Sequence, residues 1–234
     1  MQTFNQLKII EKEEELSQKI FKEAENINIE EADKNKEGLL LDKDGGVSHY
    51  QNELYWKIIK TESFNSWFNG SVAVYEDNGE PMIVFHSTLK RDLIGTNLKP
   101  NEKVDDWNSY GVYFSSNKQA TINYYENQYQ DDIKRFERLL SEESGEKENI
   151  SKEREQYLKE NEGKAKTFGA FVKIKKPLEL ENHEKLMELS WAGFNRQDLL
   201  NEHDGIIIKD DPDFYNQYIV FKSNDILTLP SETK

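Results

Sequence analysis

Three polar side chains that could bind a ligand or assist catalysis stand on or beside short strand-like runs of this 234-residue chain. His86 follows Met82-Ile-Val-Phe, Tyr113 lies inside Gly-Val-Tyr-Phe, and Gln217 precedes Tyr-Ile-Val-Phe. An imidazole titrates near neutral pH, and a tyrosine offers a flat ring with a hydroxyl. A glutamine amide donates and accepts hydrogen bonds but takes no proton. Each residue alone has an ordinary structural explanation, so their value depends on whether the fold brings them together.

The elements that must position these residues follow from patterning. Runs of aromatic and β-branched residues predict strands at 72–75, 81–86, 111–115, 168–174, 206–209 and 214–221, the last of them before Asp225-Ile-Leu-Thr-Leu. Apolar periodicity predicts helices at 6–34 (one or two), 49–60, 63–71, 117–129 with Asn117 as its cap, and 186–200. Because these elements do not repeat in a regular βαβ rhythm, we expect an α+β fold with a mostly antiparallel sheet.

The same patterning suggests how the chain is divided. Residues 1–60 form an N-terminal helical segment, and residues 61–234 form a second domain that carries the three polar side chains. Charged residues dominate between about 126 and 166, where apolar ones are few. This composition predicts a solvated helical hairpin or a partly disordered insertion.

Composition restricts the possible partners. A net charge of −14 repels phosphate backbones, so generic nucleic-acid binding is not expected. The chain has no cysteine, and it has neither a signal-peptide pattern nor a membrane-length apolar run, so we expect a cytoplasmic protein. The stretch Asp42-Lys-Asp-Gly-Gly-Val has the composition of a calcium loop but lacks the ligand spacing and the closing glutamate, so no metal is expected.

Three motifs together resemble those of the ADP-ribosyltransferase fold. They are Phe85-His-Ser-Thr, then Gly111-Val-Tyr-Phe-Ser-Ser followed by Ala120-Thr-Ile-Asn-Tyr, and finally Phe214-Tyr-Asn-Gln-Tyr-Ile-Val-Phe. They are most similar to the His-Tyr-Glu branch, which includes diphtheria-type toxins and the poly(ADP-ribose) polymerases.

Flanking segments resemble the transferase domains of phage and mobile-element polyvalent proteins. These segments are Phe64-Asn-Ser-Trp-Phe, Asp77-Asn-Gly-Glu-Pro, Phe171-Val-Lys-Ile-Lys-Lys-Pro-Leu and Asp204-Gly-Ile-Ile-Ile. The resemblance covers roughly residues 61–229. It leaves the N-terminal helices and the charged insertion unexplained.

This resemblance implies NAD as the cosubstrate, bound in a cleft where the sheet splits. His86 would hydrogen-bond the adenine-side ribose, and Ser87, where the family usually has glycine, would clamp the nicotinamide amide through its backbone. Thr88 is expected beside them in the NAD site. Tyr113 and Tyr124 would sandwich the nicotinamide ring.

Two further positions follow from the resemblance. Thr121 falls where the family places a hydroxyl that bonds the same amide, and its helical spacing from Tyr124 puts both on one face. Gln217 stands where the family carries a catalytic glutamate, so this chain has a neutral amide in place of a carboxylate. The carboxylates that could take part of that role, or serve only as loop residues, are Asp210, Asp211 and Asp213.

The resemblance therefore implies a mono-ADP-ribosyltransferase that moves ADP-ribose from NAD onto a macromolecular acceptor, expected to be a host protein in a phage or mobile-element contest. Two alternatives stay open. An NAD glycohydrolase would use the same pocket with water as acceptor. A catalytically silent relative would bind NAD or a partner protein, and Gln217 is the feature that favours it.

Overall fold

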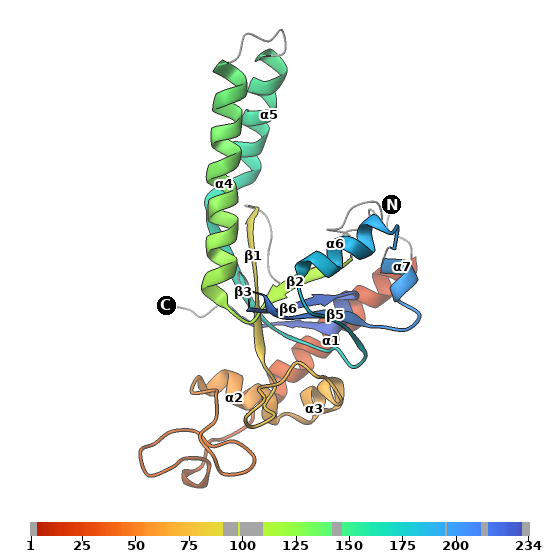
Figure 1. Cartoon of the computed structure of the whole chain (residues 1–234). Coiled ribbons are helices and arrows are strands. Elements are labelled where there is room, and N and C mark those ends of the chain that lie inside the picture. The colour runs from red at the N-terminus through yellow and green to blue at the C-terminus, as the bar shows by residue number, and fades with distance from the viewer. Residues whose placement is uncertain are drawn as a thin grey trace. The chain divides into compact units, whose positions relative to one another are not determined.

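The structure, a computed structural model, describes residues 4–90, 98, 110–141, 147–194, 196–211 and 215–230, with side chains described from residue 15 onward except those of Arg196, Asp210 and Asp211. Its helices are α1 (Phe4–Glu25), α2 (Glu53–Lys60), α3 (Glu62–Phe68), α4 (Lys118–Ser141), α5 (Lys147–Glu160), α6 (His183–Trp191) and α7 (Arg196–Leu199). Two short 3₁₀ helices are η1 (Glu31–Asp33) and η4 (Ser223–Asp225). The strands are β1 (Ile83–Lys90), β2 (Val112–Ser115), β3 (Asn161–Val172), β4 (Pro177–Leu180), β5 (Gly205–Asp211), β6 (Tyr215–Val220) and β7 (Ile226–Thr228). This combination of helices with one sheet confirms the α+β class (Figure 1).

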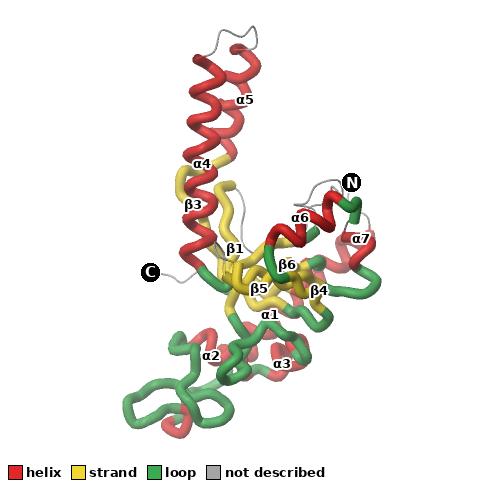
Figure 2. Tube along the Cα trace, viewed as in Figure 1, coloured by secondary structure: helices red, strands yellow, loops and turns green. Residues whose placement is uncertain are grey.

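The chain divides into two compact units. The first unit comprises Met1–Met82, Phe171–Lys175 and Asn224–Leu227, and the second comprises Ile83–Ala170, Lys176–Ser223 and Thr228–Lys234. Figure 2 shows that helices and loops make up most of the first unit, whereas most of the sheet belongs to the second.

In the first unit, α1, α2 and α3 pack on one another. Ile20 and Ala24 of α1 are fully buried, as the predicted amphipathic pattern requires. Two caps set where the later helices begin: Asn52 accepts hydrogen bonds from the first N–H groups of α2, and Thr61 does so for α3. The expected helix at 49–60 therefore begins at Glu53, after its cap.

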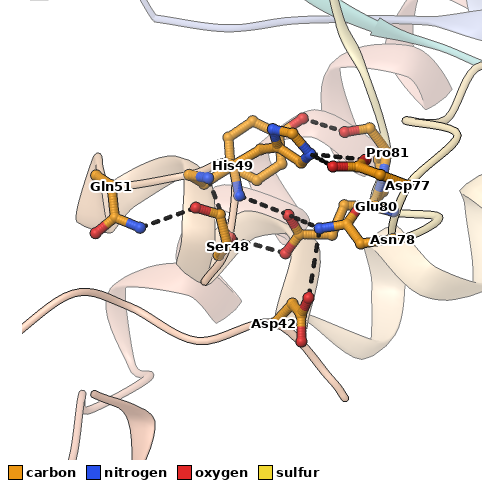
Figure 3. Close-up of polar contacts among 9 residues, drawn as sticks. Asp42, Ser48, His49, Gln51, Asp77, Asn78, Glu80 and Pro81 are labelled. Atoms are coloured by element: carbon orange, nitrogen blue, oxygen red, sulfur yellow. Dashed lines mark hydrogen bonds and ion pairs between the residues drawn. The ribbon is translucent and has the colours of Figure 1, made fainter. Parts of the chain in front are cut away.

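A buried carboxylate organises the loops of this unit (Figure 3). Glu80 is 4% exposed, and its oxygens accept hydrogen bonds from the Ser48 hydroxyl at 2.7 Å, the His49 N–H at 2.8 Å and the Asn78 amide at 3.0 Å. Full hydrogen bonding is what makes a buried carboxylate tolerable. Glu80 therefore joins the loop around residue 48 to the turn around residue 78.

Two segments of these loops bear on the sequence predictions: residues 72–75 and the stretch that begins at Asp42. The strand predicted at 72–75 is wrong: the segment forms only the isolated bridge between Val74 and Pro81, because its N–H groups bond to scattered partners, among them the carbonyls of Ile174, Val72 and Glu80, and not to one neighbouring strand. In the segment compared with a calcium loop, an Asp42 oxygen accepts the N–H groups of Asp44 and Gly46. That carboxylate closes its own turn.

The sheet has the strand order β4-β5-β6-β2-β1-β3-β7. β1 pairs with β2, β2 with β6 and β5 with β6 in antiparallel fashion, whereas β4 pairs with β5 in parallel, so the sheet is mixed. One face of β5 and β6 packs under α6 and α7 through a core of Tyr110, Leu186, Leu199, Ile206, Ile208, Ile219 and Phe221. This core anchors the strand that carries Gln217.

The charged segment forms a helical hairpin, one of the two forms that its composition predicts. α4 and α5 lie against each other (Figure 1). The Tyr157 hydroxyl donates to the Asp132 carboxylate at 2.9 Å, and the Tyr157 ring stacks on Tyr129 with centroids 5.8 Å apart. A few aromatic contacts thus hold two otherwise solvated helices together.

Replacing the central carboxylate of the loop network should destabilise the first unit. In Glu80→Gln, an amide NH₂ replaces one acceptor oxygen and faces donors, which should cost about 1–3 kcal/mol of unfolding free energy. Thermal unfolding followed by tryptophan fluorescence measures this, since Trp56 and Trp67 lie in the same unit. Glu76→Gln, the same change on an exposed neighbour, is the control. Equal midpoints for the two variants would contradict the role given to Glu80.

Candidate functional site

The candidate site is built on the pairing of β2 with β6. Gln217 lies opposite Ser115 on one side and Ile208 of β5 on the other, and Tyr113 lies opposite Ile219. Directly opposed residues of an antiparallel pair share a face, and residues two apart in a strand do as well. Tyr113, Ser115 and Gln217 therefore occupy one face of the sheet.

A glycine allows this pairing. A Cβ on Gly111 would lie 2.3 Å from the Val220 carbonyl oxygen, closer than real Cβ atoms approach. Any other residue would push β2 away from β6 at the end of their ladder. The glycine of the Gly-Val-Tyr motif thus serves the register that places Tyr113 and Gln217.

Gln217 is the most unusual polar side chain of the site. It is 5% exposed, and its Nε2 has no hydrogen-bond partner among the residues that the structure describes. A buried polar group left unpaired costs about 1–3 kcal/mol, and native proteins keep few of them. An amide held in this way is suited to a ligand that brings the missing acceptor.

His86 joins the site through the main chain of β2. Its Nδ1–H donates to the Tyr113 carbonyl at 2.8 Å, which leaves Nε2 to accept a hydrogen bond. Burial lowers the pKa of His86, partly offset by that hydrogen bond, so the ring is neutral at pH 7. The imidazole contacts Phe114 and Tyr125 with ring centroids 5.8 and 6.5 Å away. Phe114 alternates to the face opposite Tyr113, and its pairing position and ring contact with His86 put the imidazole on that opposite face, so His86 is linked to Tyr113 through the backbone bond.

Hydroxyl groups from three elements meet next to His86. The Ser87 Oγ lies 2.7 Å from the Thr121 Oγ1 of α4 and 2.9 Å from the Thr167 Oγ1 of β3. Ser87 is 1% exposed. Sequence reasoning named Ser87 and Thr121 but missed Thr167, because nothing local distinguishes this threonine from others in a strand.

The start of α4 is tied to the same face. Asn117 caps the helix, accepting the Ala120 N–H at 3.0 Å, as predicted, and its own N–H donates to the Ser115 hydroxyl at 2.9 Å. Because Ser115 is the partner of Gln217, this bond fixes the first turn of α4 beside the Gln217 row. Thr121 follows in the next turn.

The remaining predicted residues have more ordinary surroundings. Thr88 is buried, and its hydroxyl accepts the Lys90 N–H at 3.2 Å, a local strand-end contact. Tyr124 is 42% exposed, and its ring meets the Tyr125 ring edge-on at 5.2 Å. Burial raises the pKa of Tyr125 to about 12. The side chains of Asp210 and Asp211, and all of Asp213 and Phe214, lie outside the described residues.

The chemistry available follows from these groups. A neutral imidazole acceptor, an unpaired amide donor, buried hydroxyls and tyrosine rings suit a flat, hydroxyl-bearing ligand.

In the described part of the chain, no group of three or more histidine or acidic side chains is placed to hold a metal ion. No described helix has both the length and the apolarity to cross a membrane. Comparisons of the chain with protein-family models, with curated proteins and with solved structures give no match.

The ionisation of His86 can be measured directly. Because burial lowers its pKa, the ring should take up a proton at lower pH than the ordinary histidine midpoint of about 6.5. A lowered folded-state pKa means that the stabilising contribution is present above about pH 6.5 and is lost as the pH falls below it. A titration followed by NMR of the imidazole C–H signals tests this, with His86→Gln to assign the resonance. A midpoint at or above 6.5 would be inconsistent with the buried, neutral ring.

Proposed function

We propose that this chain is a mono-ADP-ribosyltransferase, which transfers ADP-ribose from NAD to a macromolecular acceptor and releases nicotinamide. The observation that carries the proposal is the buried Gln217 amide, unpartnered among the described residues and on one face with Tyr113. Gln217 and Tyr113 stand at two of the three positions that define the family motifs, and His86, the third, bonds the main chain of Tyr113. The proposal is thus supported by the three motifs lying on the neighbouring strands β1, β2 and β6, although they are far apart in the sequence.

The surroundings of the site support a nucleotide ribose as ligand. His86 offers a neutral Nε2 that can accept from a ribose hydroxyl, and Gln217 offers a donor that a ribose oxygen can satisfy. Tyr113 and Tyr124 would hold the nicotinamide ring, and Ser87, Thr88 and Thr121 would surround its amide. These roles come from the resemblance, and the buried polar groups of this chain fit them.

The neutral amide determines the rate that we expect. Nicotinamide leaves NAD as a neutral molecule from a cationic ring, so the protein must mainly orient the bond and stabilise positive charge on the ribose. Gln217 can orient the ribose but supplies no negative charge. The absence of one charge-assisted contact costs on the order of 2–4 kcal/mol of transition-state stabilisation, a hundredfold to a thousandfold in rate.

We also propose the finer details that the resemblance implies. The sheet around Gln217 would be the split, mostly antiparallel core of an ADP-ribosyltransferase, and the antiparallel pairings of β1, β2, β5 and β6 are in keeping with it. The acceptor would be a host protein, modified in the host cytoplasm by a toxin-like enzyme of a phage or mobile element. The net charge of −14 argues against a nucleic-acid acceptor held by its backbone.

The same amide favours a second candidate function. A site with a neutral imidazole and a neutral amide can hold NAD without promoting its cleavage, so a catalytically silent NAD-binding protein is the alternative. Hydrolysis of NAD by water in the same pocket is a third outcome. The products of one assay separate the three functions.

Restoring the carboxylate should accelerate transfer. With labelled NAD and bacterial host lysate, Gln217→Glu should label protein about 10²–10³ times faster than the natural chain, because the new charge stabilises the ribose cation. His86→Ala and Tyr113→Ala should each abolish labelling. Gln128→Glu, the same change at an exposed position of α4, is the matched control and should have no effect.

The product distribution decides among the candidates. Labelled protein supports transfer, free ADP-ribose indicates a glycohydrolase, and NAD binding with no nicotinamide release even in Gln217→Glu indicates the silent alternative. Labelling that survives both alanine substitutions would rule out the proposed site.

A further inference from the structure

The hydroxyls of Thr167, Ser87 and Thr121 form a continuous chain. Thr167 Oγ1 lies 2.9 Å from Ser87 Oγ, which lies 2.7 Å from Thr121 Oγ1. Thr121 Oγ1 in turn donates to the Lys118 carbonyl at 2.9 Å. The chain runs from β3 through β1 to the first turns of α4, and both Ser87 and Thr121 are buried.

The carbonyl at one end fixes the direction of every bond. A carbonyl oxygen only accepts, and a hydroxyl carries a single hydrogen, so Thr121 uses its hydrogen on Lys118. Ser87 must then donate to Thr121, and Thr167 must donate to Ser87. Such an aligned chain is also the arrangement in which neighbouring hydrogen bonds polarise one another.

This direction determines what Thr121 can offer a ligand. Its hydrogen is engaged and one lone pair takes the Ser87 hydrogen, so one lone pair remains to accept. An accepting oxygen suits the N–H of a carboxamide and repels a carboxylate. The same geometry explains how a serine fits at position 87, since both of its bonds are made to Thr121 and Thr167.

We propose that Ser87 and Thr167 are positioning residues that hold the Thr121 hydroxyl as an acceptor, and that this makes the site select a carboxamide over a carboxylate. The inference rests on the proposed function, because it takes the nicotinamide end of NAD as the group beside Thr121. Lys118 holds the Thr121 hydrogen, and Thr167, by donating to Ser87, occupies a Ser87 lone pair that could otherwise accept that hydrogen. Without Thr167, this lone pair is open to the Thr121 hydrogen, and the Lys118 carbonyl alone keeps the direction.

The test compares two ligands that differ in one group. Calorimetric titration with NAD and with nicotinic acid adenine dinucleotide, whose ring bears a carboxylate, gives a selectivity ratio. The natural chain should prefer NAD by more than about tenfold. Thr167→Val should lower this ratio about fivefold, because a hydrogen bond that fixes the chain is lost. Thr167→Ser, which keeps the hydroxyl, should restore the ratio.

Two further variants separate positioning from stability. Ser87→Ala interrupts the chain at its centre and should also lower the ratio. Thr228→Val makes the same substitution as Thr167→Val at another half-buried threonine, in β7, and should leave the ratio unchanged. A loss of thermal stability alone would not alter the preference between two ligands.

The outcomes distinguish this inference from the function on which it rests. A natural chain that binds neither dinucleotide overturns the proposed function, and the inference with it, before any variant is made. A natural chain that binds NAD but shows no preference overturns the inference alone. So does an unchanged ratio in Thr167→Val or, should that variant not fold, in Ser87→Ala.

Discussion

The register between β2 and β6 is the constraint on which the rest of the site depends. Side chains alternate along a strand, so a slip of one residue would turn Gln217 and Tyr113 to the other face. Gly111 permits the close approach at one end of the ladder, and Ser115, opposite Gln217, binds the N–H of Asn117 at the other. The pairing therefore positions the first turn of α4 as well as the two strands.

Two buried polar side chains illustrate how structural and functional groups differ in this molecule. Glu80 is a buried carboxylate whose oxygens accept three hydrogen bonds. These bonds replace the water contacts that the carboxylate loses on burial. Gln217 is equally buried, but its Nε2 is unpaired in the described part of the chain. The first therefore stabilises its loops, whereas the second has the unpaired donor on which the proposed ligand contact depends.

Local patterns predicted the parts of the fold that local physics determines. The β2 and β6 strands, the cap at Asn117 and the helix after it follow from side-chain type and capping chemistry, and the structure contains all of them. Sequence patterns gave wrong or missing predictions where contacts between distant segments determine the structure. The N–H groups of residues 72–75 bond to scattered partners and not to one neighbouring strand. The short edge strand β4 was not predicted, and it tolerates Pro177 at its first position because an edge strand needs no N–H there. Thr167 could not be found either, since its importance lies in a contact with Ser87, 80 positions away in the chain.

The electrostatic character of the site limits the chemistry that we propose for it. Gln217 takes no proton, and burial lowers the pKa of His86, which makes its neutral imidazole a weaker base for a weakly acidic hydroxyl. Extending a polymer of ADP-ribose requires activation of a ribose hydroxyl, whereas a reactive acceptor can be modified once without it. In the proposed enzyme, orientation by Tyr113, Gln217 and the aligned hydroxyls would contribute to both reactions equally. Under the proposed function, a neutral but well-ordered site would therefore favour slow, single transfer over elongation.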